Sequence, residues 1–65
     1  MNNIFNQLKK DAQYALNSKK LTLAYQAYGA AKMAFTLGAI TKNEFYELNT
    51  MLVVNGINKP SAGLE

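Results

Sequence analysis

The sequence predicts an all-α protein, a small three-helix bundle in which the second helix is central. Two observations carry this prediction: apolar residues recur at helical spacing in three segments, and turn or capping residues separate those segments. The length of 65 residues allows one domain only, and a domain of this size buries a modest share of its unfolded surface. We therefore expect a single domain over residues 1–57, followed by a flexible tail over residues 58–65.

The first predicted helix covers about residues 3–17. If its apolar spacing continued past Leu16, it would meet polar side chains at Lys19 and Thr22, so the phase of the pattern breaks there. This break predicts a turn at residues 17–19 rather than one long helix. The apolar stripe expected on the first helix comprises Ile4, Phe5, Leu8, Ala12, Ala15 and Leu16.

The second predicted helix, about residues 20–37, is apolar around most of its circumference. Its polar residues form a narrow strip, which is typical of a central helix covered on more than one side. Gly29 in its interior lowers helix propensity by about 1 kcal/mol relative to alanine. This glycine either marks a close helix crossing or is simply tolerated. The core stripe expected on this helix comprises Leu21, Ala24, Tyr28, Ala31 and Phe35.

The third predicted helix, about residues 42–55, has the most clearly marked boundaries. Gly38 supplies the left-handed residue that ends the preceding helix. Thr41 and Glu44 form the capping box T-x-x-E, in which each side chain satisfies a backbone donor of the other residue. The dipeptide Asn55-Gly56 is expected to end the third helix. Its buried stripe is expected to comprise Phe45, Leu48, Met51 and Leu52.

The residues after the third helix are predicted to lie outside the bundle. Pro60 removes a backbone donor and therefore prevents further regular helix. Leu64 and Glu65 look like a cloning scar that precedes an affinity tag, so they do not enter the predicted fold.

The residue inventory excludes most catalytic and metal chemistry. The chain has no Cys and no His, so it lacks both a thiol nucleophile and an imidazole that could transfer protons near neutral pH. We expect no enzyme activity, no catalytic residue, no cofactor, no metal ion and no small-molecule substrate. The most apolar window, residues 21–40, contains Lys32 and several polar residues, so no membrane span is expected. A cytoplasmic location follows by default.

Three residues are candidate protein contacts. Tyr25 and Tyr46 fall outside the main apolar stripes, so part of each ring is expected to be exposed, and tyrosine is enriched at interfaces. Gly29 suits the close approach of a second helix. The leading hypothesis is therefore a non-enzymatic protein-interaction or oligomerisation module that binds a partner protein or forms a homodimer.

The basic charge leaves a second hypothesis open. The net charge of +3 comes from seven lysines and four acidic residues, with no arginine to read phosphates or guanines through a planar fork. Lys9 and Lys10 on the first helix could contact a phosphate backbone, and Lys42 and Asn43 could contact DNA if the corner before the third helix acted as a helix–turn–helix. Two glutamates on the same helix oppose this alternative, a small nucleic-acid-binding regulator.

The corner before the third helix also carries a resemblance. The pattern G-x-I-T-x-x-E-F in LGAITKNEFYELNTML, carried by Ile40, Thr41, Glu44 and Phe45, is similar to the corner of SHOCT-type short helical domains. It is also similar to small uncharacterised helical proteins of bacterial mobile elements such as conjugative transposons and prophages. The match covers about a quarter of the chain. The resemblance implies an interaction or oligomerisation module, without catalysis, that serves as an accessory to a mobile element.

Overall fold

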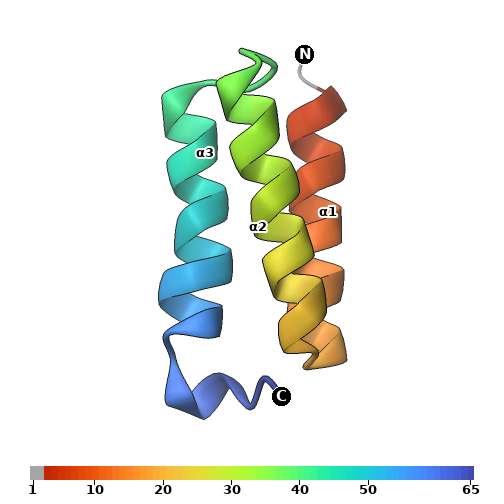
Figure 1. Cartoon of the computed structure of the whole chain (residues 1–65), viewed down its shortest axis with the longest axis vertical. Coiled ribbons are helices and arrows are strands. Elements are labelled where there is room, and N and C mark those ends of the chain that lie inside the picture. Colours follow the sequence, from red (N-terminus) through yellow and green to blue (C-terminus); the bar gives the residue numbers. More distant parts are fainter. Residues whose placement is uncertain (1–2) are drawn as a thin grey trace.

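The computed structural model describes residues 3–65, which form an all-α three-helix bundle without a strand. In Figure 1 the three main helices run down, up and down, so α2 is antiparallel to both neighbours. Helix α3 continues without a break into a π-helix, η1, and a short 3-10 turn, η2, follows. The bounds are Asn3–Ser18 for α1, Leu21–Thr36 for α2, Lys42–Asn49 for α3, Thr50–Ile57 for η1 and Pro60–Ala62 for η2.

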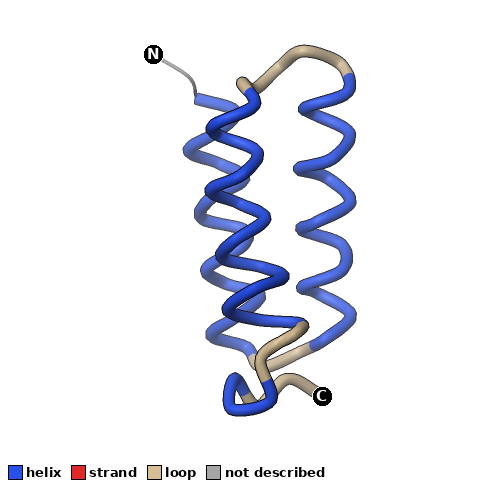
Figure 2. The backbone as a smooth tube through the Cα atoms, turned by 90° about the vertical axis from the view of Figure 1, so that its left-hand side faces the viewer, coloured by secondary structure: helices blue, strands red, loops and turns tan. Residues whose placement is uncertain are grey.

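The helices pack as a triangle around a core built largely from alanine. Helix α2 contacts both neighbours along its length, and α1 also contacts α3 and η1 (Figure 2). In the described chain only Leu48 and Leu52 are large side chains that are fully buried. The remaining buried apolar residues are mostly small, which allows the helix backbones to approach closely. They are Ala12, Ala15, Ala24, Ala27, Ala31 and Ile40.

Helix α2 is covered on two sides and open on the third. Its inward side consists of Ala24, Ala27 and Ala31, which are buried against the neighbouring helices. This confirms the prediction that the second helix is central and covered on more than one side. Tyr25 and Met33, among other large residues, are exposed because only two helices are available to cover α2.

The turn between α1 and α2 lies where the break in apolar spacing predicts it. Helix α1 ends at Ser18, and the next residue, Lys19, has a φ of 58°. This left-handed conformation is uncommon for a residue with a side chain. The Lys19 N–H donates to the Leu16 carbonyl oxygen at 3.2 Å, which closes the last turn of α1. The chain therefore reverses direction within two residues.

The corner between α2 and α3 confirms the predicted signals. Gly38 has a φ of 76°, and its N–H donates to the Phe35 carbonyl oxygen, while the Ala39 N–H donates to the Ala34 carbonyl oxygen. These two bonds form a Schellman motif, which satisfies the last carbonyls of α2. At the start of α3, the Glu44 N–H donates to Thr41 Oγ1 at 3.1 Å, and the Thr41 N–H donates to Glu44 Oε1 at 2.8 Å.

The end of the third helix differs from the prediction. Asn55-Gly56 does not end it, because the helix continues as η1 to Ile57. Gly56 is buried, and a Cβ at this position would lie 2.8 Å from Leu16 Cδ2. The glycine therefore lies in close contact with α1 and does not form a left-handed helix end, and a Cβ there would require the end of the Leu16 side chain to shift. A local Asn-Gly signal cannot reveal this contact, because Leu16 is distant in the sequence.

The C-terminal segment packs against the α1–α2 turn and so differs from the free tail that the sequence predicts. No regular helix follows Pro60, as predicted, and Pro60 begins the single 3-10 turn η2. Lys19 Nζ donates to the Ala62 carbonyl oxygen at 3.0 Å, and the Leu21 N–H donates to the Glu65 carbonyl oxygen at 2.7 Å. The second bond satisfies a backbone donor at the start of α2, where Lys20 supplies no side-chain cap.

Gly56→Ala is expected to lower the free energy of unfolding by about 1 kcal/mol. The added Cβ overpacks the contact with Leu16, at a cost of about 1–3 kcal/mol, against about 1 kcal/mol gained in helix propensity. Urea denaturation at micromolar protein concentration measures the change. The matched variant is Gly29→Ala, where a Cβ would have no neighbour within 4 Å. It is expected to raise stability by about 1 kcal/mol. Equal shifts in the two variants would contradict the close packing at Gly56.

Thr41→Ala is expected to lower the free energy of unfolding by about 1 kcal/mol, because the first turn of α3 loses the side-chain acceptor of its capping box. Thr36→Ala is the control, since Thr36 is exposed at the other end of the same corner. The control is expected to change stability by less than about 0.5 kcal/mol. The same denaturation measurement applies, and a Thr41→Ala variant as stable as the control would show that the capping box does not hold the corner.

Candidate interaction surface

Two of the predicted contact residues lie together on the open side of α2. Tyr25 is 55% exposed, and Gly29, one turn further along, is also exposed. Because residues four apart share a helix face, Met33 and the C-cap residue Leu37 continue the same line, and they are 59% and 74% exposed. We call Tyr25, Gly29, Met33 and Leu37 the α2 outward stripe. Sequence reasoning missed Met33 and Leu37, although their four-residue spacing from Gly29 could have identified them.

The α2 outward stripe is uncharged. Lys32 is the only charged residue in the whole of α2, and it lies to one side of the stripe by helical spacing. The other lysines lie on α1, on α3, or in the turn and tail segments. An exposed apolar line without charge costs free energy in water, and such patches commonly mark interaction sites.

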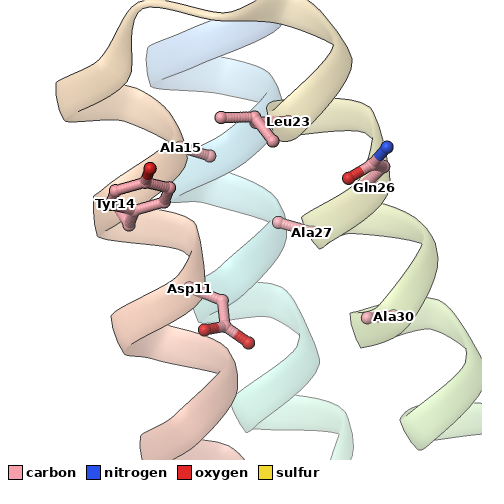
Figure 3. Close-up of a pocket in the computed structure, with 7 residues that line it drawn as sticks. All are labelled: Asp11, Tyr14, Ala15, Leu23, Gln26, Ala27 and Ala30. Carbon is pink, nitrogen blue, oxygen red and sulfur yellow. The ribbon is translucent and has the colours of Figure 1, made fainter.

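A hollow of about 230 Å³ beside the stripe separates it from α1. Figure 3 shows that the Asp11 carboxylate points into the space between the two helices, while Ala27 and Ala30 of α2 present only methyl groups. Tyr14 is exposed at the α1 side of this hollow. A side chain that entered the hollow from outside the chain would meet both the Asp11 carboxylate and these methyl groups. Its lining residues are Asp11, Tyr14, Ala15, Leu23, Gln26, Ala27 and Ala30.

The third predicted contact residue, Tyr46, lies on a different helix. Its ring contacts that of Phe45 with centroids 6.5 Å apart, and the Lys42 ammonium lies 5.6 Å from its centroid. Phe45 in turn stacks on Phe35 at 5.0 Å. Tyr46 therefore belongs to an aromatic cluster between α2 and α3, beside the Gly38 corner. The structure thus groups Tyr25 with Gly29, and it places Tyr46 on a second surface.

Two of the candidate nucleic-acid contacts, Lys9 and Lys42, already interact with other side chains of the chain. Lys9 Nζ forms an ion pair with the Glu47 carboxylate at 2.7 Å and lies 5.6 Å from the Phe5 ring centroid. Lys9 and Lys10 line a second hollow of about 410 Å³ between α1 and η1. Lys42 lies over the Tyr46 ring, and Asn43 beside it is exposed at the start of α3.

The corner itself does not have the geometry of a DNA-reading helix–turn–helix. In that motif the two helices meet at about 90–120°. Helices α2 and α3 instead lie side by side and antiparallel over their length (Figure 1). The two glutamates of α3 share its surface with Lys42, and one of them neutralises Lys9.

Other kinds of site find no support in residues 3–65. This part of the chain contains no cluster of three or more His, Cys, Asp or Glu residues that could hold a metal ion. Along the same residues, no helix combines the length and the apolar character needed to cross a membrane. Comparison with protein-family models, with curated proteins and with solved structures found no match.

Substitution of the stripe residues is expected to leave the fold intact. Tyr25→Ser and Met33→Gln should each change the free energy of unfolding by less than about 0.5 kcal/mol at micromolar protein concentration, because both side chains are exposed. Leu48→Ala is the contrasting variant, and loss of this fully buried side chain should cost about 2–5 kcal/mol. Urea denaturation compares the three. A loss from either stripe variant as large as that from Leu48→Ala would show that the stripe supports the fold itself.

Proposed function

We propose that the protein is a non-enzymatic interaction module that binds a protein partner through the α2 outward stripe. The observation that carries this proposal is the exposure of Tyr25, Met33 and Leu37 along one uncharged line of the bundle. The bundle covers its own core without these side chains. Their burial therefore becomes available to a partner as binding free energy.

The chemistry of the stripe suits a protein rather than a small charged ligand. Aromatic and methionine side chains are enriched in interface cores, whereas lysine and the acidic residues are depleted there. The hollow beside Tyr14 adds a recess into which a partner side chain can insert. A buried anchor in such a recess is the usual form of an interface hot spot.

The nucleic-acid alternative draws less support. Its candidate contacts on α1 and α3 include Lys9, which Glu47 already neutralises, and Lys42, which lies over an aromatic ring. The antiparallel corner also presents no separate recognition helix of the kind that enters a major groove.

We also propose, from the resemblance of the Gly38 corner, that the module is an accessory protein of a bacterial mobile element. A cytoplasmic location is part of the same proposal. Neither the inventory of side chains nor the surface suggests a reaction, because the chain has no His and no Cys.

Site-specific photo-cross-linking tests the proposal. Benzoylphenylalanine is introduced in place of Tyr25, in place of Met33, or in place of Asn43 as a control exposed on α3. Each variant is irradiated in an extract of the cells that express the protein. Positions 25 and 33 are expected to give a cross-linked protein adduct, and position 43 is expected to give none. Excess wild-type protein should compete for the adduct, and excess Met33→Lys protein should not.

Two results would contradict the proposed function. One is the absence of any competed protein adduct from Tyr25 and Met33. The other is binding to a DNA duplex that survives near-physiological salt and is lost on substitution of Lys42 or Asn43, since binding by scattered phosphate contacts weakens steeply with salt.

A further inference from the structure

We propose that the partner seated on the α2 outward stripe is a second copy of this chain, whose α2 crosses the first in antiparallel orientation about a two-fold axis at Gly29. The inference rests on the proposed function and names its partner.

Gly29 has no role within its own chain. It lies inside α2, where glycine weakens the helix relative to alanine. Positive φ angles occur at Gly38 and Gly63 but not at Gly29, so the backbone does not require a glycine there. A Cβ at Gly29 would have no neighbour within 4 Å, so intramolecular packing does not require one either. The missing side chain is useful only to a helix that approaches from outside, because it lets two backbones come close.

The residues around Gly29 are symmetric about it. Tyr25 and Met33 lie four residues before and after it, and Thr22 and Thr36 lie seven residues before and after it. At 3.6 residues per turn, these four residues project within about 40° of the Gly29 direction. All five residues are exposed.

In a two-fold interface, each contact between residue i of one copy and residue j of the other occurs a second time between j and i. An antiparallel crossing at Gly29 places Tyr25 opposite Met33 of the partner subunit, and the contact occurs twice. A thioether against an aromatic ring is a favourable contact. The same register places the hydroxyl of Thr22 near that of Thr36 of the partner subunit.

Charge favours this face for self-association. The chain carries a net charge of +3, so most pairs of identical faces would bring lysines together. Lys32, the one charged residue of α2, projects about 60° from the Gly29 direction, at the edge of this face, so its flexible side chain can extend into water. A strongly acidic partner would instead be drawn to the lysines of α1.

The available area also fits a dimer. A specific interface of standard size buries about 800 Å² on each partner, which is roughly a fifth of the 4339 Å² surface of this chain. The bundle has extents of 32 × 16 × 16 Å, and one long side of such a body holds roughly that share of its surface. The α2 side, with Tyr14 and Leu37 at its margins, is one long side.

Thiol cross-linking of the purified protein tests the register, since the 65-residue sequence has no cysteine. Two singly substituted proteins, Thr22→Cys and Thr36→Cys, are mixed and treated with a short thiol cross-linker. The antiparallel two-fold arrangement predicts that the mixed product dominates over both homodimeric products. Adding Gly29→Glu to both proteins should abolish the mixed product, and Asn43→Cys should give only background. Circular dichroism of the Gly29→Glu proteins confirms that they fold.

Sedimentation equilibrium of the unmodified protein gives the second readout. The mass is expected to double from 7.2 kDa with increasing concentration, and Gly29→Glu should keep it at 7.2 kDa. A protein that stays monomeric to millimolar concentration overturns the inference. Homodimeric products equal to the mixed product overturn the antiparallel register.

The experiments distinguish failure of self-association from failure of the proposed function. If the purified protein is monomeric but the adducts from Tyr25 and Met33 in cell extract persist, the partner is a different protein, and only the self-association falls. If those adducts are also absent, both proposals fall.

Discussion

The close approach of α2 to its two neighbours across alanine side chains is the constraint on which the rest of the structure depends. Ala24, Ala27 and Ala31 form its inward side, and Ala12 and Ala15 face them from α1. Alanines let helix backbones come close, but each buries little apolar surface compared with a leucine, whose burial contributes about 1.5–3 kcal/mol. The bundle therefore has a thin core, with Leu48 and Leu52 as its only large, fully buried side chains among the described residues.

Because the core is built largely from small residues, several large apolar side chains remain exposed on the surface. In α2 the tyrosine and methionine of the outward stripe are exposed, while Ala24, Ala27 and Ala31 are buried. A domain of about 60 residues has marginal stability on its own, and this chain has no disulfide to supplement its core. Covering the stripe with a second protein surface would add stability by mass action. The small size of the core residues and the exposure of the α2 outward stripe are thus both consistent with binding to a second protein.

The parts of the fold that the sequence predicts are those set by neighbouring residues. The Gly38 corner forms as expected, because the Schellman bonds and the Thr41–Glu44 capping box join residues three to five apart. Gly56 and the C-terminal segment differ from the prediction because distant partners decide them. Leu16 occupies the space beside Gly56, and the turn at Lys19 accepts and donates the hydrogen bonds of the tail.

The candidate site was predictable to the same limited extent. Tyr25 and Gly29 lie on the exposed side of α2 because they fall outside its alanine stripe, which helical spacing reveals. The apolar character of α2 does not distinguish Met33 and Leu37 from its covered residues, and only their four-residue spacing from Gly29 does. Tyr46 is exposed as expected, but it lies on α3 beside its sequence neighbour Phe45 and not with Tyr25.

Unfolding of the wild type and of Gly29→Ala, followed over a wide range of protein concentration, tests the central claim most directly. At micromolar concentration Gly29→Ala should be the more stable protein by about 1 kcal/mol, since alanine is the better helix former. As concentration rises, the wild type should gain stability because its native state binds itself, and Gly29→Ala should gain less because its added methyl holds the two α2 helices apart. Converging curves support the account. Curves that stay flat or parallel would contradict it, because Gly29 would then have no role outside its own chain.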